Sequence, residues 1–512
     1  MTDVAGLRTR FDAWSVAAVT LALAAMVFQA VMPTKDDISW LIINAQALID
    51  GKELYKDIIE TNPPLSVLLY VPAVLIEYLT GLRAELSSIV ITGLTGLAIA
   101  RWIRWRLEAA GVEGGGRMEA ATVLVFLVLP LGAYGQKDQI AALIALPFCI
   151  ELALQAGNRG KMSVLTGALA GLSMAIKPQF AAAILLPCLW VAARSQLRGE
   201  RCWPWLVVNR ATITAGVVVV VFQGLVYLLF PAFFRDVLSA VLEVYVPARR
   251  PLLTLLLPMK GFLFIALLAM PVIYGPRTVL SEVVAAAGLG FFIAFLVQGK
   301  GWPYHLFPAT SYGLFLVFGE ILPRVWKQRS SRSPVAAALI AAVVVSVHAM
   351  WMTVTWTDWS ALTRAIVATG IRQPTILNIA ASHDVGHPST RDAGGRWVGT
   401  YSCRWITALA TNDAQGDAEG AGNETLARWL MHDRDVLRRD IAERQPDVIL
   451  VDRRGNFDWL AWAREDPATA LLLDRYVPAA EVTDYGNTGH IELLRRENAD
   501  NGGSGKDTRP TG

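Results

Sequence analysis

The stretch WSVAAVTLALAAMVFQAVM, residues 14–32, contains no charged residue, and the polar segment PTKDD, residues 33–37, follows it directly. A helix of about 20 apolar residues spans the hydrocarbon core of a bilayer, so this stretch predicts a membrane-spanning helix. Arg8 and Arg10 precede it, and its Ala-x-Ala sites fall inside the apolar core rather than after it. We therefore interpret it as an uncleaved first span that begins in the cytoplasm.

Long apolar runs recur as far as Trp356 and then stop. Of the 512 residues only 17% are charged, whereas soluble proteins carry about 25%. Charged residues become frequent from Thr357 onward, which predicts a domain boundary at this point. The small net charge of +3 gives no indication of a nucleic-acid partner. Together with the first run, the following runs predict about 11 spans: Leu86–Trp105, Ala120–Tyr134, Ile140–Ala156, Val164–Ile176, Phe180–Ala193, Leu206–Phe230, Phe262–Tyr274, Val279–Val297, Tyr304–Leu322 and Val335–Trp356.

Four loops between these runs are rich in arginine and lysine, the residues that membrane proteins retain in cytoplasmic loops. Placing all four in the cytoplasm gives a path that alternates from Leu86 to the C-terminus. The chain is then expected in a bacterial inner (plasma) membrane, with residues after 356 outside, in the periplasm of a Gram-negative cell. The basic residues are Arg101, Arg104, Arg106 and Arg117; Arg159 and Lys161; Arg194, Arg198, Arg201 and Arg210; and Arg324, Lys327, Arg329 and Arg332.

A further apolar stretch, Pro63–Leu79, cannot cross fully on this path, because the segments on both sides of it lie outside. It opens with Asn62-Pro63-Pro64 and carries Pro72 and Glu77, so we expect an interfacial or re-entrant helix. The alternative is an ordinary span, which would place one of the basic loops outside.

The sequence predicts three parts: a transmembrane module over residues 1–356, an extracytoplasmic α/β domain over 357–496 and a disordered tail over 497–512. In the α/β domain, Thr375–Ala380 and Val448–Val451 are typical of strands, and Glu424–Glu443 of a helix. The chain has Cys149, Cys188, Cys202 and Cys403, of which only the last lies in this domain, so no disulfide is expected within it. His383 and His387 lack a third ligand in the sequence, which favours a loop over a metal site.

Acids and bases gather in the segments that this topology places outside. Ionisable groups at helix ends near a bilayer are costly without a task or a partner, so these residues form the candidate site. Taken singly, the aspartates could cap helices, and the lysines could extend toward lipid headgroups. The candidates are Asp36, Asp37, Tyr55, Lys137, Asp138, Lys177, Arg249, Arg250, Lys300, Tyr304 and His305.

In their order, these motifs resemble the C-type glycosyltransferase superfamily, and within it the branch of protein O-mannosyltransferases, the lipid A aminoarabinose transferase and the rhizobial lipopolysaccharide transferases. In that branch, an acidic pair follows the first helix, and after it come a helix that ends in Gly, a Tyr and a Pro-Pro-Leu motif. The corresponding residues of this chain, in the same order, are Asp36-Asp37, Gly51, Tyr55 and Pro63-Pro64-Leu65. The later likenesses are Asp138, Lys177 and Tyr304-His305-Leu306-Phe307-Pro308. The chain departs from the family at Asn62, where a lysine often precedes Pro-Pro-Leu.

The resemblance implies an inverting glycosyltransferase that moves a sugar from a polyprenyl-phosphate donor to a glycan, lipid or protein acceptor outside the cytoplasm. Asp36 would be the general base, with Asp37 or Asp138 assisting. Lys177 and Lys300, with Lys137, Arg249 and Arg250, would bind the donor phosphate. No cofactor follows from the sequence, although a divalent metal remains compatible with it. A lipid-linked sugar flippase and a non-catalytic assembly subunit are the alternatives.

Overall fold

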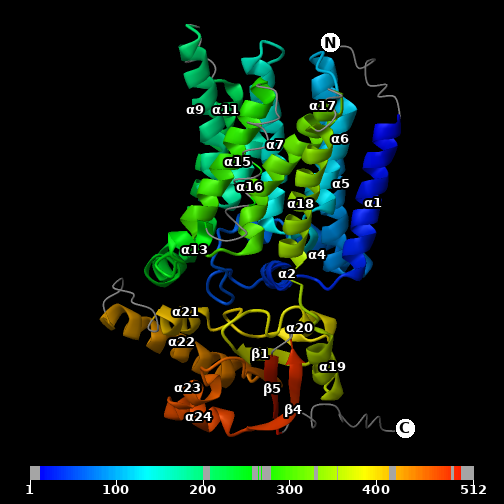
Figure 1. Ribbon diagram of the computed structural model, residues 1–512. Coiled ribbons are helices and arrows are strands. Elements are labelled where there is room, and N and C mark those ends of the chain that lie inside the picture. Colours follow the sequence, from blue (N-terminus) through cyan, green and yellow to red (C-terminus); the bar gives the residue numbers. More distant parts are fainter. Residues whose placement is uncertain are drawn as a thin grey trace, which may run out of the picture. The chain divides into compact units, whose positions relative to one another are not determined.

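The computed structural model describes residues 12–199, 208–256, 263, 267, 278–327, 333–353, 356–413, 423–485 and 489–497. The chain forms two compact units (Figure 1). The helical unit comprises Met1–Met32, Asn62–Pro231 and Arg249–Trp356, and the second unit comprises Pro33–Thr61, Ala232–Ala248 and Thr357–Gly512. The division at Trp356 follows the change in composition, whereas two earlier segments join the second unit. Of the expected tail over 497–512, all but residue 497 lies outside the described residues, as does most of Phe262–Tyr274.

The described part of the helical unit consists mainly of helices, several of them long and apolar. In chain order its elements are α1 (Ala13–Val31), α3 (Leu65–Leu68), α4 (Val71–Thr80), α5 (Ala84–Ala109), α6 (Gly115–Val123), η2 (Leu124–Val128), η3 (Leu131–Ala133), α7 (Lys137–Ala156), α8 (Val164–Ile176), η4 (Pro178–Phe180), α9 (Ala181–Leu197), α11 (Arg210–Leu229), α13 (Leu252–Leu256), α15 (Val279–Gln298), α16 (Pro303–Leu316), η7 (Val317–Ile321), α17 (Leu322–Lys327) and α18 (Ser333–Thr353).

Within the described residues, seven helices are long and apolar enough to cross a membrane, and Leu65–Thr80, Val164–Ile176 and Ala338–Thr353 are shorter apolar helices. The number of crossings therefore stays a prediction. The stretch Pro63–Leu79 forms two short helices, α3 and α4, and neither has the length of a span.

Small residues bring the helices of this unit close together. A Cβ atom added to Gly167 of α8 would lie 2.2 Å from the carbonyl oxygen of Ala211 on α11, and one on Gly290 of α15 would lie 2.4 Å from that of Ala182 on α9. Close backbone approach of this kind is how helices associate in lipid, where no hydrophobic effect drives them together.

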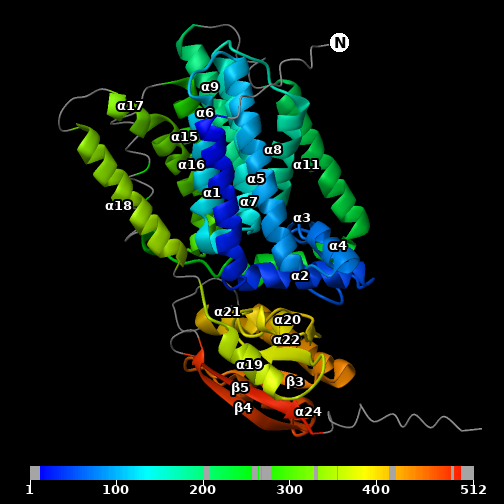
Figure 2. The ribbon, with the colours of Figure 1, turned by 90° about the vertical axis from the view of Figure 1, so that its right-hand side faces the viewer.

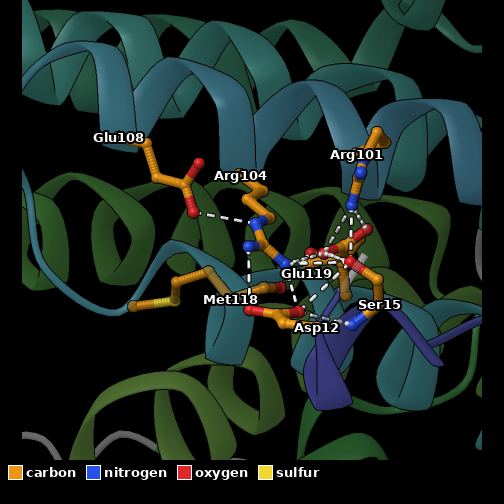
Figure 3. A network of polar contacts seen from close by, with 8 residues as sticks. Asp12, Ser15, Arg101, Arg104, Glu108, Met118 and Glu119 are labelled. Carbon is orange, nitrogen blue, oxygen red and sulfur yellow. Dashed lines mark hydrogen bonds and ion pairs between the residues drawn. The ribbon is translucent and has the colours of Figure 1, made fainter. Parts of the chain in front are cut away.

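Ion pairs connect the predicted cytoplasmic ends of several helices, and in the Arg104–Glu119 pair both side chains are buried. Arg104 of α5 pairs with Asp12 before α1 at 2.8 Å and with Glu119 of α6 at 3.0 Å, and Arg101 also contacts Glu119 (Figure 3). Further pairs join Arg106 to Glu151 and Arg194 to Glu282, each at 2.8 Å. The ends of α5, α7 and α9 and the starts of α1, α6 and α15 therefore lie at one end of the helical unit (Figure 2), as the alternating path predicts.

The second unit contains a five-stranded mixed sheet in the order β2-β1-β3-β5-β4. β1 pairs in parallel with both β2 and β3, β5 pairs antiparallel with β3, and β4 pairs antiparallel with β5. Helices pack side chains such as Leu437 and Trp462 onto buried strand residues such as Ile449. The strand β1 and the helix α22 lie where they were predicted. The elements are α2 (Asp36–Ile49), η5 (Phe233–Val237), α12 (Leu238–Ala240), η6 (Val241–Tyr245), α19 (Ser360–Ala368), β1 (Thr375–Ile379), α20 (Ser389–Asp392), β2 (Arg396–Trp397), α21 (Trp405–Asp413), α22 (Asn423–Arg444), β3 (Val448–Asp452), α23 (Trp459–Arg464), α24 (Pro467–Leu473), β4 (Tyr476–Tyr485) and β5 (Gly489–Arg496).

The segment with α2 is bound firmly to the C-terminal residues of this unit. The indole N–H of Trp40 donates to Glu60 at 2.7 Å, and the Trp40 ring packs against that of His387. Past α2, the backbone N–H of Ile59 donates to the carbonyl oxygen of Thr400 at 2.8 Å. The contacts with His387 and Thr400 connect residues that lie more than 300 positions apart in the chain.

Candidate functional site

In the helical unit, the predicted site residues Asp138 and Lys177 meet Gln298 at three helix ends. Lys177 at the end of α8 is buried, and its ammonium group lies 2.9 Å from Asp138 in the first turn of α7 and 2.9 Å from the side-chain oxygen of Gln298 at the end of α15. Lys177 therefore does not extend toward solvent, and Asp138 does more than cap a helix. Pro178 follows Lys177 and ends α8 at this point, because the residue before a proline disfavours the helical conformation.

Aromatic rings and further lysines surround this pair. The ammonium groups of Lys137 and Lys177 lie 5.7 and 5.6 Å from the centre of the Tyr304 ring, within the range of a cation–π contact. The Tyr304 ring in turn lies 4.4 Å from that of the buried His305. Lys300 is buried and follows Gly299, whose left-handed φ of 68° ends α15.

Arg249 and Arg250 adjoin the same end of α15. The backbone N–H of Arg250 donates to the carbonyl oxygen of Gly299 at 2.9 Å, and the side chain of Arg249 packs over the same glycine. A Cβ atom at position 299 would lie 2.9 Å from the side chain of Arg249. Glycine therefore permits both the left-handed turn and the close contact with Arg249. Both arginine side chains are exposed, whereas Lys137, Lys177 and Lys300 are buried.

An apolar cavity of about 220 Å³ lies between α3, α4, α5, α7 and α8. Ile176 precedes Lys177 in the chain, and Ile140 follows Asp138 by two positions; both line the cavity. Leu65, directly after the Pro-Pro pair, lines it as well. In the helical unit, a cluster of positively charged side chains therefore lies next to the apolar cavity.

In the second unit, Asp36 lies between two cationic partners. Its carboxylate is 2.7 Å from the ammonium group of Lys35 and 3.1 Å from Nε2 of His383. The N-cap residue of α2 is Lys35, whose side chain makes no capping bond, so Asp36 and Asp37 belong to the first helical turn and Asp36 is not the cap. Both aspartates are buried, and the positive end of the helix dipole favours their ionised form.

The charges of this cluster stabilise one another. Burial alone would raise the pKa of Asp36, but Lys35 and His383 hold it well below its usual range. Burial likewise opposes the charge on His383, yet the Asp36 carboxylate raises the pKa of that imidazole well above its ordinary value, and Cys403 adds to this. At neutral pH the pair is therefore a carboxylate facing an imidazolium.

His387 behaves differently from its neighbour. Its ring packs 4.4 Å from that of Trp397, and burial lowers the pKa of the imidazole to about 3, so it stays neutral. Throughout the ranges that the structure describes, no three His, Cys, Asp or Glu side chains converge as a metal site would require.

Reasoning from the sequence missed two partners of the predicted residues. The sequence favours a loop at His383, and it gives no indication of a role for Gln298. No pattern in the sequence joins His383 to Asp36, because the contact exists only once the chain has folded. Tyr55 lies in the second unit, where its ring packs 5.0 Å from that of Phe233.

Comparison with known proteins identifies a fold. No family model and no curated protein sequence matches the chain. It is similar to ArnT from Cupriavidus metallidurans, in the apo state and bound to undecaprenyl phosphate, with a TM-score of 0.54 and 15% identity over 94% of this chain and 97% or 98% of the other. The arabinofuranosyltransferase AftD from Mycobacteria matches with a TM-score of 0.46 and 14% identity over 94% of this chain and 40% of the other. The likeness to ArnT confirms the predicted resemblance to the C-type glycosyltransferases at the level of the fold.

Proposed function

We propose that the chain is a membrane glycosyltransferase that moves a sugar from a polyprenyl-phosphate donor to an acceptor hydroxyl group outside the cytoplasm. The observation that carries the proposal is the buried cluster of lysines beside an apolar cavity in the helical unit. A polyprenyl phosphate has the same two parts, an anionic head and an apolar chain. ArnT, which shares the fold, has been seen bound to undecaprenyl phosphate.

The charge of the cluster suits a phosphate. When Lys137, Lys177, Lys300 and Asp138 are all ionised, these side chains sum to +2, since three positive charges face one negative charge. The donor is a phosphodiester with one negative charge, and the polyprenyl phosphate that leaves is a monoester, which carries about −1.5 to −2 at neutral pH. Preorganised cations next to a leaving phosphate stabilise the negative charge that develops on it as the glycosidic bond breaks.

We assign the role of general base to Asp36. The acceptor oxygen would form a bond to the anomeric carbon, its proton would pass to the Asp36 carboxylate, and the bond from that carbon to the phosphate oxygen would break. The products are the glycosylated acceptor and the free polyprenyl phosphate. Lys35 and His383 keep Asp36 ionised and thus able to accept a proton, but they also make it a weak base.

The decisive test uses the full chain in nanodiscs with an undecaprenyl-phosphate-linked pentose or hexose and an extract of bacterial envelope glycolipids as the acceptor source. We expect release of undecaprenyl phosphate and label transfer to the acceptor fraction. A flippase would instead move the intact donor across liposomes without releasing lipid phosphate. Transport without release in the same preparation would reject the transferase.

A further inference from the structure

A second cavity lies wholly within the second unit, and the roles assigned above do not use it. It has a volume of about 520 Å³, within the usual range for small-molecule sites. Three parts of the chain form its wall: the loop after α2, the helical segment 232–248, and α21 with α22 and the residues before them.

Aromatic rings form the buried part of the cavity. Tyr55, Tyr401 and Trp429 are buried, and Trp405 is partly so. Tyr55 holds a left-handed φ of 74°, a conformation that a bulky residue rarely adopts and that tends to occur at binding sites. Flat rings of this kind offer large apolar faces with a polar tip, which suits the C–H faces and hydroxyl groups of a sugar.

Hydrogen bonds and stacking fix these rings in place. The fully buried Arg404 lies with its guanidinium group 5.2 Å from the centre of the Tyr401 ring and 3.4 Å from Asp433 of α22. The Tyr401 hydroxyl bonds to Nε2 of His432 at 3.2 Å, and the indole N–H of Trp429 donates to Glu243 at 2.8 Å. The shape of the cavity is therefore preorganised before any ligand arrives.

The rim of the cavity carries an excess of positive charge. Four basic residues, Lys56, Arg235, Arg428 and Arg439, face two acidic ones, Asp236 and Glu243. Arg428 is paired with Glu243. Neither Arg235 nor Arg439 forms an ion pair with any residue in the described parts of the chain, and both side chains are exposed. Arginine binds carboxylates and phosphates through paired N–H groups, so two such side chains indicate an anionic ligand.

We propose that this cavity binds an anionic saccharide, a sugar carrying a carboxylate or phosphate group, as the distal part of the acceptor. This rests on the proposed function, because it names the acceptor of that reaction. Asp36 lies in the first turn of α2 and the Tyr55 loop follows its other end, a helix length of about 21 Å at 1.5 Å per residue. A separation of this size makes the cavity a subsite for sugar units away from the reacting hydroxyl group.

The test measures binding of a trigalacturonate probe to the full chain in nanodiscs by saturation-transfer NMR and by titration. The neutral probe galactotriose and inorganic phosphate serve as comparisons. We expect trigalacturonate to bind, with its ring protons saturated, and Arg439→Gln or Arg235→Gln to weaken it about tenfold or more. Arg438→Gln is the matched control, because Arg438 neighbours Arg439 on α22 but is paired with Asp435 and Asp466.

Wild-type affinity in both cavity variants, or equal binding of galactotriose, would overturn the anionic subsite. Binding of inorganic phosphate alone would do so as well, because it would show an anion site without a sugar site. Failure of the proposed function looks different: donor turnover would be absent while trigalacturonate still bound in an Arg439-dependent manner.

Discussion

At the scale of single residues, a substitution of Asp36 tests the proposed reaction most directly. We expect Asp36→Asn to lower turnover by about 10²–10⁴-fold, because the amide keeps the shape of the side chain but cannot take the acceptor's proton. Asp50→Asn, at the other end of the same helix, is the matched control. The measurement is release of undecaprenyl phosphate, with donor binding and a melting curve alongside. Near-normal turnover in a folded Asp36→Asn protein would remove Asp36 from the mechanism and make Asp138 the next candidate.

The contact with His383 predicts a dependence on pH. The pKa of His383 is raised, so its proton leaves only above the ordinary value of about 6.5. Once it leaves, one of the two cations that lower the pKa of Asp36 is gone, and the carboxylate becomes a stronger base. Turnover should therefore rise as the pH increases above neutrality.

In His383→Gln this alkaline rise should be absent, because the glutamine carries no proton to lose. A pH–rate profile of both proteins checks this, with His490→Gln on β5 as a control that should keep the wild-type profile. Superimposable profiles for the wild type and His383→Gln would show that the imidazole does not tune the base.

At the scale of elements, the ends of α7, α8 and α15 meet at Lys177. We expect Lys177→Met to raise the donor concentration needed for half-maximal turnover by about tenfold or more, because a hydrogen bond to a charged group contributes about 1.5–3 kcal/mol. The substitution leaves the buried Asp138 carboxylate beside an apolar group, which can destabilise the folded protein. The double variant with Asp138→Asn removes that buried charge, so it shows the effect on donor binding apart from the effect on folding. Lys161→Met, in an exposed loop, is the control. Unchanged donor dependence in the folded double variant would count against a phosphate site.

We predict that the ion-pair network of α1, α5 and α6 stabilises the folded protein and takes no part in the transfer reaction. Arg104→Gln removes one of the two cations that contact the buried Glu119 and leaves Arg101 at 3.1 Å. The loss of stability should therefore be smaller than the roughly 3–5 kcal/mol that leaving a buried charge without any partner typically costs. We expect a clearly lower melting temperature in detergent and an unchanged donor requirement in the protein that remains folded. Arg198→Gln, at an exposed position, should melt as the wild type does. A raised donor requirement with normal melting would assign the network to the site instead.

At the scale of the whole molecule, the proposed chemistry needs residues after 356 outside the cytoplasm. The warrant is the placement of arginine and lysine in four loops. Ion pairs join the end of α5 in the first of these loops to Asp12 before α1 and to the end of α7, where the second loop begins. We expect alkaline phosphatase fused after Trp356 to be active in bacteria, and a fusion after Lys327 to be inactive. A fluorescent reporter that matures only in the cytoplasm should give the opposite pattern. Cytoplasmic behaviour of the Trp356 fusion would overturn the assignment of sides.

The sequence by itself determined the long helices and several elements of the sheet. Apolar runs such as Val164–Ile176 coincide with a helix of the same bounds, and the strand β3 lies where Val448–Val451 was predicted. This was possible because burial in lipid or in a sheet depends on local composition and periodicity, which are written along the chain. The order of the motifs around Asp36, Asp138 and Lys177 also indicated the fold that the comparison with ArnT bears out.

Only the tertiary structure decided which side chains meet. Asp36 meets His383 at 3.1 Å, and Lys177 meets Asp138 at 2.9 Å. The cavity around Tyr55 and Arg439 draws on three separate parts of the chain in the same way. Such contacts depend on the path of the backbone between distant residues, and no local periodicity or composition records that path. The sequence therefore fixes which groups need a partner when they are buried, and folding determines which partner each one finds.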